Sequence, residues 1–133
     1  YKRQLLDDPE LLNFVKAHPE YMLIDPRGPA DEVCAAIAGC RHVFASSLHG
    51  LVVADAYGVA NTWIDPKGQS RLKYHDYAAG LGRDMRAPLP LSAVPGLTLP
   101  DPEARLPYQA AIDAARTALH RSFPAQLRQE NAA

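Results

Sequence analysis

The sequence has little of what marks several specialised classes of protein. It contains only two cysteines, Cys34 and Cys40, and neither has further cysteines or clustered histidines beside it. Two cysteines without such partners make a poor zinc site, so we interpret them as reduced thiols in the core. This cysteine usage predicts a cytoplasmic protein without a metal site.

Charge and hydrophobicity exclude two further classes. The 133 residues carry 14 Lys and Arg against 15 Asp and Glu, a net charge of −1, so the basic surplus of a nucleic-acid-binding protein is missing. No uninterrupted apolar run reaches membrane-spanning length, and no signal peptide is recognisable. With 47% hydrophobic residues, the sequence predicts one soluble globular domain. Because it begins at Tyr1 rather than at a methionine, we expect an excised or processed piece of a longer protein.

What the sequence does contain is one stretch, residues 40–58, with the pattern of a strand, a polar turn and a helix. Val43–Ala45 is an apolar run of strand length, Ser46 and Ser47 interrupt it, and an apolar segment from His49 to Gly58 follows. In α/β proteins the carboxyl end of a parallel strand and the amino end of the next helix form ligand sites. Either serine can cap the helix, whose nearly uniform apolar composition predicts burial.

The rest of the chain alternates between strand and helix patterns. We expect strands at 21–25 and 61–65, and helices at 9–18, 31–38, 71–81 and 108–123. Alternation at this spacing predicts an α/β fold, a Rossmann-like parallel sheet flanked by helices, with a core over about residues 8–83 and adjacent strands at 23–24, Val43–Ala45 and 62–64. Prolines recur through residues 87–107, which we expect to form an extended strap without regular structure.

Three segments together resemble the polysaccharide pyruvyl transferase family, in particular its exopolysaccharide ketal-pyruvate transferase branch. They are Ser-Ser-Leu-His-Gly-Leu-Val-Val-Ala-Asp-Ala-Tyr-Gly at 46–58, Asn-Thr-Trp-Ile at 61–64 and Leu-Lys-Tyr-His-Asp-Tyr at 72–77. The resemblance covers residues 23–83. It departs from many family members at Ser47, where they carry an arginine that can contact the donor phosphate or carboxylate.

This resemblance implies a function and a larger protein. The expected reaction transfers pyruvate from phosphoenolpyruvate to two hydroxyls of one sugar in a lipid-linked exopolysaccharide precursor, forming a ketal without a cofactor. The expected fold is the carboxyl-terminal half of a bacterial two-domain GT-B enzyme, working in the cytoplasm or at the inner face of the membrane. Since GT-B-like sites lie between two domains, we expect this chain alone to be inactive, with an apolar docking surface on its last helix for the amino-terminal domain.

His49 is the candidate acid–base residue, because an imidazole at the amino end of a helix can exchange protons near neutral pH. A capping or core histidine is the structural alternative. We predict that Lys73 faces the same cleft. The candidate substrate-binding residues, each with a structural alternative in capping, packing or solvation, are Ser46, Ser47, Gly50, Lys67, Arg71, Lys73, Asp76 and Tyr77. Asp55, inside an apolar helix, is predicted to be a structural hydrogen-bond acceptor.

Two other functions stay open at this point. GT-B carboxyl domains usually bind a sugar nucleotide, so a glycosyltransferase domain is the second enzyme class, although no pair of carboxylates has the spacing to hold a ribose and diphosphate. A non-catalytic binding module or inactive fragment is the third possibility.

Overall fold

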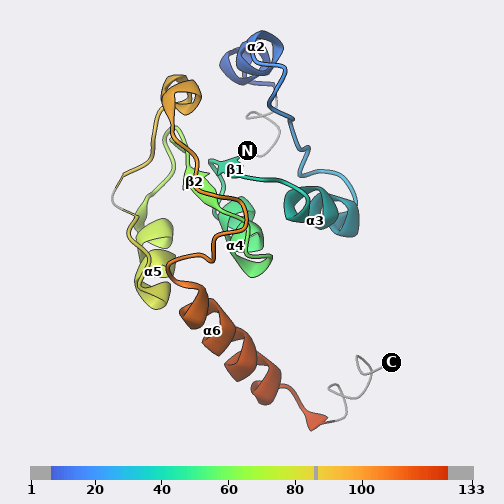
Figure 1. Cartoon of the computed structure of the whole chain (residues 1–133), viewed down its shortest axis with the longest axis vertical. Coiled ribbons are helices and arrows are strands. Elements are labelled where there is room, and N and C mark those ends of the chain that lie inside the picture. Colours follow the sequence, from blue (N-terminus) through green and yellow to red (C-terminus); the bar gives the residue numbers. More distant parts are fainter. Residues whose placement is uncertain (1–6, 86, 126–133) are drawn as a thin grey trace.

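The computed structural model describes residues 7–85 and 87–125 and has an α/β architecture (Figure 1). Its elements in chain order are α2 (Pro9–Ala17), α3 (Ala30–Ala38), β1 (Val43–Ala45), α4 (Leu48–Ala56), β2 (Asn61–Trp63), α5 (Leu72–Leu81), the 3₁₀ helix η1 (Leu91–Gly96) and α6 (Gln109–Ser122). In Figure 1, α2 and η1 lie at one end of the molecule and α6 extends from the other.

The two strands form a small parallel sheet, as the alternation of strands and helices predicts. Val43 lies opposite Asn61, and Ala45 lies opposite Trp63. A third segment continues the sheet through one parallel bridge, in which Leu89 pairs with Ile64. Parallel strands joined through α4 and α5 direct their carboxyl ends to one edge of the sheet.

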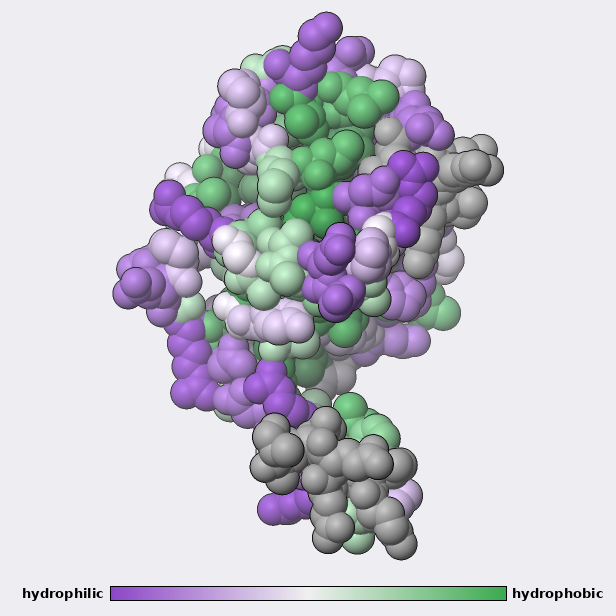
Figure 2. All heavy atoms as spheres, turned by 90° about the vertical axis from the view of Figure 1, so that its right-hand side faces the viewer, coloured by the Kyte–Doolittle hydropathy of each residue, from purple (hydrophilic) through white to green (hydrophobic). Residues whose placement is uncertain are grey.

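The strand predicted at residues 21–25 is wrong. Among the described residues, no backbone hydrogen bond joins this segment to β1; the nearest ones close turns, from Tyr21 N to His18 O and from Gly28 N to Asp25 O. Ile24 still packs against the core, but Met22 and Leu23 are 68% and 38% exposed. An apolar run therefore brings one side chain to the core without pairing the backbone. Figure 2 shows apolar side chains gathered at the end of the molecule where α2 lies.

The Pro-rich segment is more regular than the sequence predicts. Leu89 N donates to Trp63 O at 2.9 Å, and Leu89 O accepts from Asp65 N at 2.9 Å. Leu91–Gly96 then forms η1, which includes Pro95 and buries Val94 to 1% exposure. The prediction of an irregular strap is thus wrong at both places, because the residue between two prolines keeps its own N–H and C=O and a short 3₁₀ turn tolerates proline.

α4 lies at the centre of the packing. Its Leu51 belongs to a cluster with Trp63, Tyr74, Ala78 and Met85, and its Ala54 to a second cluster with Ile37, Val43 and Val59. Ser47 caps the helix by accepting from Gly50 N at 3.1 Å, as predicted for one of the two serines. The first turn is close to β1, since a Cβ on Gly50 would lie 2.9 Å from Ala45 Cβ.

Asp55 is buried to 1% exposure and accepts hydrogen bonds from four side chains, so its predicted structural role is confirmed. Oδ1 accepts from Asn61 Nδ2 and the Tyr108 hydroxyl, both at 2.7 Å. Oδ2 accepts from the Tyr77 hydroxyl at 2.8 Å and Arg83 Nη1 at 2.9 Å. The pKa values of Tyr77 and Tyr108 lie well above the ordinary value for tyrosine. Burial is the larger cause, and the hydrogen bond to Asp55 is the second. The carboxylate thereby joins α4, β2, α5 and the residue before α6.

α6 contacts this core mainly through its beginning. Ile112 is buried, whereas Leu119 and Phe123 are 62% and 46% exposed. The last helix therefore exposes apolar side chains, as expected for a docking surface, although its partner stays a prediction.

Gly50→Ala is expected to destabilise the protein by about 1–3 kcal/mol, because the added methyl would have to displace Ala45 or Ser47. Gly80→Ala in α5 is the matched control: apart from its chain neighbours and the backbone of its own helix, nothing lies within 4 Å of the added Cβ, so the gain in helix propensity should stabilise by about 0.5–1 kcal/mol. Urea unfolding measures both. Equal effects of the two substitutions would contradict the close contact between α4 and β1.

Asp55→Asn should lower the free energy of unfolding by about 3–5 kcal/mol, since it leaves the buried Arg83 without its carboxylate and sets an NH₂ group among donors. Asp113→Asn removes an exposed ion pair with Arg105 and should cost less than about 1 kcal/mol. Similar losses in chemical denaturation would show that the Asp55 network is not central to stability.

Candidate functional site

A cavity of about 270 Å³ opens at the edge of the sheet where the three parallel segments end. Ser46 follows β1, Asp65 follows the bridge at Ile64, and Pro90 follows Leu89. The full lining is Asp8, Glu10, Leu11, Ser46, Ile64, Asp65, Lys67, Pro90 and Leu91. The carboxyl edge predicted from the sequence therefore does carry a cavity, and α2 and η1 enclose it.

Lys67 binds two carboxylates at this edge. Its Nζ donates to Asp8 Oδ2 at 2.6 Å and to Glu10 Oε2. These hydrogen bonds raise the pKa of the Lys67 ammonium and, together with a backbone N–H, lower that of the Asp8 carboxyl. The loop positions the lysine: Asp65 Oδ1 accepts from Lys67 N at 3.1 Å, and Lys67 adopts a left-handed φ of 41°. The cation thus ties the beginning of α2 to the end of β2.

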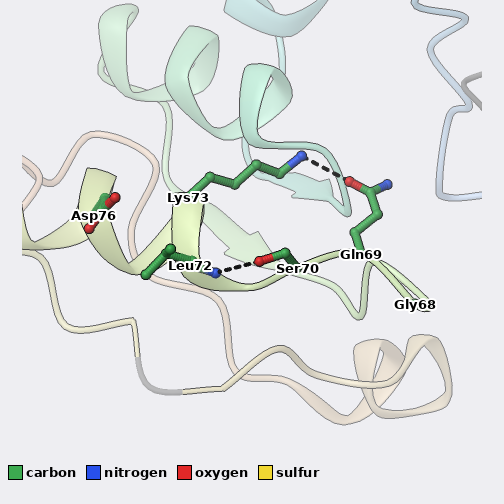
Figure 3. Close-up of a pocket in the computed structure, with 6 residues that line it drawn as sticks. All are labelled: Gly68, Gln69, Ser70, Leu72, Lys73 and Asp76. Atoms are coloured by element: carbon green, nitrogen blue, oxygen red, sulfur yellow. Dashed lines mark hydrogen bonds between the residues drawn. The ribbon is translucent and has the colours of Figure 1, made fainter.

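A second, shallow pocket of about 530 Å³ lies at the beginning of α5. Its lining is Gly68, Gln69, Ser70, Leu72, Lys73 and Asp76 (Figure 3). Lys73 Nζ donates to Gln69 Oε1 at 2.9 Å and lies 5.2 Å from the centre of the Tyr74 ring. The ammonium stays at the surface, where it can meet an anion.

His49 lies in the first turn of α4, directly after the carboxyl end of β1, as predicted. Its side chain is exposed and has no hydrogen-bond partner among the described residues. It therefore neither caps the helix nor belongs to the core. His49 lines neither of the two pockets, so the predicted cleft shared with Lys73 stays a prediction.

The serines and Gly50 have structural contacts. Ser46 lines the 270 Å³ cavity while its carbonyl accepts from the Tyr74 hydroxyl at 2.7 Å. Ser47 Oγ is the helix cap, and Gly50 packs against β1, so neither needs a ligand to explain it.

The candidates on α5 are divided between two environments. Arg71, the residue before the helix, is exposed, and Asp76 lines the shallow pocket with Lys73. Tyr77 instead directs its hydroxyl to Asp55. The structure therefore brings Lys73 and Asp76 together and turns the Tyr77 hydroxyl toward the structural network.

Sequence reasoning missed several residues of the cavity: Asp8, Glu10, Leu11, Asp65 and Leu91. Asp65 could have been found, because it is the polar last residue of the strand predicted at 61–65. Asp8 and Glu10 carried only the signal of a helix start, which Asp8 indeed provides by accepting from Glu10 N. Within residues 7–85 and 87–125, no three His, Cys, Asp or Glu side chains are grouped so that they could hold a metal ion.

In open parallel α/β sheets, ligands bind outside the carboxyl ends of the strands, which is the edge where this chain has its cavity. The family model for polysaccharide pyruvyl transferase matches residues 1–68, half of the chain, and the chain belongs to this family. The match includes Leu48, His49 and Gly50 and ends before the segment that contains Lys73. No curated protein and no solved structure matches the chain.

In the described part of the chain, no helix combines the length and hydrophobicity needed to cross a membrane.

His49→Ala should leave the free energy of unfolding unchanged within about 0.5 kcal/mol, since the exposed imidazole stabilises nothing. His42→Ala is the contrasting variant: its half-buried ring bonds Thr62 Oγ1 through Nε2 at 2.8 Å, and its loss should cost about 1–3 kcal/mol. A large loss of stability in His49→Ala would assign this histidine a structural role.

Proposed function

We propose that this chain is the carboxyl-terminal unit of an enzyme that transfers the pyruvyl group of phosphoenolpyruvate to a sugar of an exopolysaccharide precursor, closing a ketal. Family membership supports the pyruvyl transfer. The observation that supports a role for one particular residue is the exposed imidazole of His49, which lies at a helix amino terminus and at the carboxyl edge of the sheet.

The reaction needs one proton donor and a site for negative charge. His49 protonates the terminal methylene carbon of the enol, which becomes a methyl group. The first sugar hydroxyl then adds to the neighbouring carbon, which bears the phosphate and has become electrophilic. The carbon–oxygen bond to phosphate breaks, and the second hydroxyl closes the ketal. Of the two hydroxyl protons released, one restores the imidazolium and the other leaves on phosphate, so the imidazole finishes the cycle as it began.

The donor's negative charge can be held by groups close in sequence to His49 and by the start of α5. The N–H groups of Leu48 and His49 belong to the first turn of α4, where they have no intrahelical acceptor. Arg71 and the Lys73 ammonium are exposed cations on the next helix. Since Ser47 is engaged as the cap, these groups are the substitutes for the arginine that many relatives carry at that position.

The parent protein has a second, amino-terminal domain that completes the cleft in a GT-B arrangement, and it acts at the cytoplasmic side, where phosphoenolpyruvate is present. The exposed apolar side chains of α6 give that domain a place to dock. The chain alone therefore binds ligands without turnover.

The decisive experiment is His49→Ala in the full-length parent, with phosphate release from phosphoenolpyruvate as the measurement. Turnover should fall by about a hundredfold or more, because the general acid is lost while the fold is kept. Lys16→Ala, at an exposed position on α2 that has no role in the proposal, is the control and should retain normal turnover. Near-normal turnover in His49→Ala would remove this residue from the mechanism.

A ligand titration separates this proposal from the glycosyltransferase alternative. Phosphoenolpyruvate should raise the melting temperature of the chain, whereas UDP-glucose and GDP-mannose should not. A shift produced by a nucleotide sugar alone would favour the alternative.

A further inference from the structure

The 270 Å³ cavity at the sheet edge has a lining divided between apolar and hydrogen-bonding groups. Leu11, Ile64, Pro90 and Leu91 supply apolar surface. The remaining side chains are the three carboxylates of Asp8, Glu10 and Asp65, the Lys67 ammonium and the Ser46 hydroxyl. Apolar surface beside a few placed polar groups is typical of small-molecule sites.

The charge of this lining disfavours the pyruvyl donor. Three carboxylates against one ammonium leave an excess of negative charge, and Lys67 is already bonded to Asp8 and Glu10. Phosphoenolpyruvate would have to displace both carboxylates and then remain beside them. The side chains of Lys67 and Glu10 are 47% and 55% exposed, so water weakens the repulsion, but the excess of carboxylates still makes an anion a poorer occupant than an uncharged molecule.

A neutral sugar ring fits the same lining. Carboxylates and a serine hydroxyl accept hydrogen bonds from ring hydroxyls, and the apolar side chains cover the C–H face of a ring. The volume lies just below the range of roughly 300–1,000 Å³ that is usual for small-molecule pockets, so it suits one ring rather than an extended chain.

We propose that this cavity is the acceptor subsite and binds one uncharged sugar ring, with Glu10 and Asp65 as its hydrogen-bond acceptors. The assignment rests on the proposed function. It also places acceptor and acid within reach of each other: Ser46 lines the cavity, and His49 follows three residues later, a stretch that spans at most about 11 Å. Donor and acceptor then occupy the two sides of the β1–α4 turn.

The experiment follows backbone amide signals of the isotope-labelled chain during titration with methyl β-D-glucopyranoside, methyl β-D-galactopyranoside and, separately, phosphoenolpyruvate. At least one glycoside should shift the signals of Glu10, Ile64, Asp65 and Leu91, and saturating phosphoenolpyruvate should not reverse these shifts. Glu10→Gln should weaken glycoside binding by about tenfold or more, because a charged acceptor is lost. Glu103→Gln, an exposed carboxylate outside the cavity, should leave it unchanged.

A second variant fills the cavity. Leu91→Trp should abolish the glycoside shifts while the remaining amide signals keep their folded positions. Glycosides that shift no cavity signal, or that phosphoenolpyruvate displaces from it, would overturn the acceptor assignment. Those outcomes are distinct from failure of the proposed function, which is read from the turnover of His49→Ala and from donor binding at residues 48–50.

Discussion

The buried carboxylate of Asp55 is the interaction on which the rest of the structure depends. The two strands are only three residues long, and so short a sheet cannot organise a domain by its ladder alone. The carboxylate compensates by fixing the ends of several elements at once, through Asn61, Tyr77, Arg83 and Tyr108. Arg83 extends the network to Asn61 Oδ1 at 2.7 Å and lies over the Tyr108 ring. Neutralising the carboxylate would therefore weaken the contacts between elements more than it would weaken the internal hydrogen bonding of any one helix.

Local signals in the sequence predicted the elements that depend on local physics. A proline after a capping aspartate begins α2, a serine caps α4, and the apolar run Val43–Ala45 becomes β1. The predictions failed where strand pairing depends on residues that are distant in the sequence. Residues 21–25 have the same apolar character as β1 but no strand partner among the described residues, whereas Leu89, inside a Pro-rich segment, has one in β2. Composition indicates that a segment is apolar, but only the tertiary arrangement decides whether its backbone forms hydrogen bonds with a neighbouring strand.

The candidate site shows the same division. The position of His49 followed from the strand–turn–helix pattern, because the first residues of a helix after a buried strand must emerge at the sheet edge. The contact of Lys67 with Asp8 and Glu10 did not follow, since these residues are 59 and 57 positions away in the sequence. The sequence predicted Lys67 as a candidate contact for the donor's charges, with a solvated basic loop as the alternative. In the structure its charge is already used, which moves the expected donor contacts toward Arg71, Lys73 and the first turn of α4.

The two prolines that flank Leu89 have an effect on how the sheet ends. Leu89 directs its N–H and C=O groups inward to β2, so the backbone groups of Pro88 and Pro90 alternate toward the outer side. Neither proline has an N–H to offer there. The Pro90 carbonyl already accepts from Ala93 N at 3.0 Å, so a strand from another molecule that approached this side would find neither the donors nor the full set of acceptors that a continuous ladder requires. The outermost segment thus completes the sheet while protecting its edge against edge-to-edge aggregation.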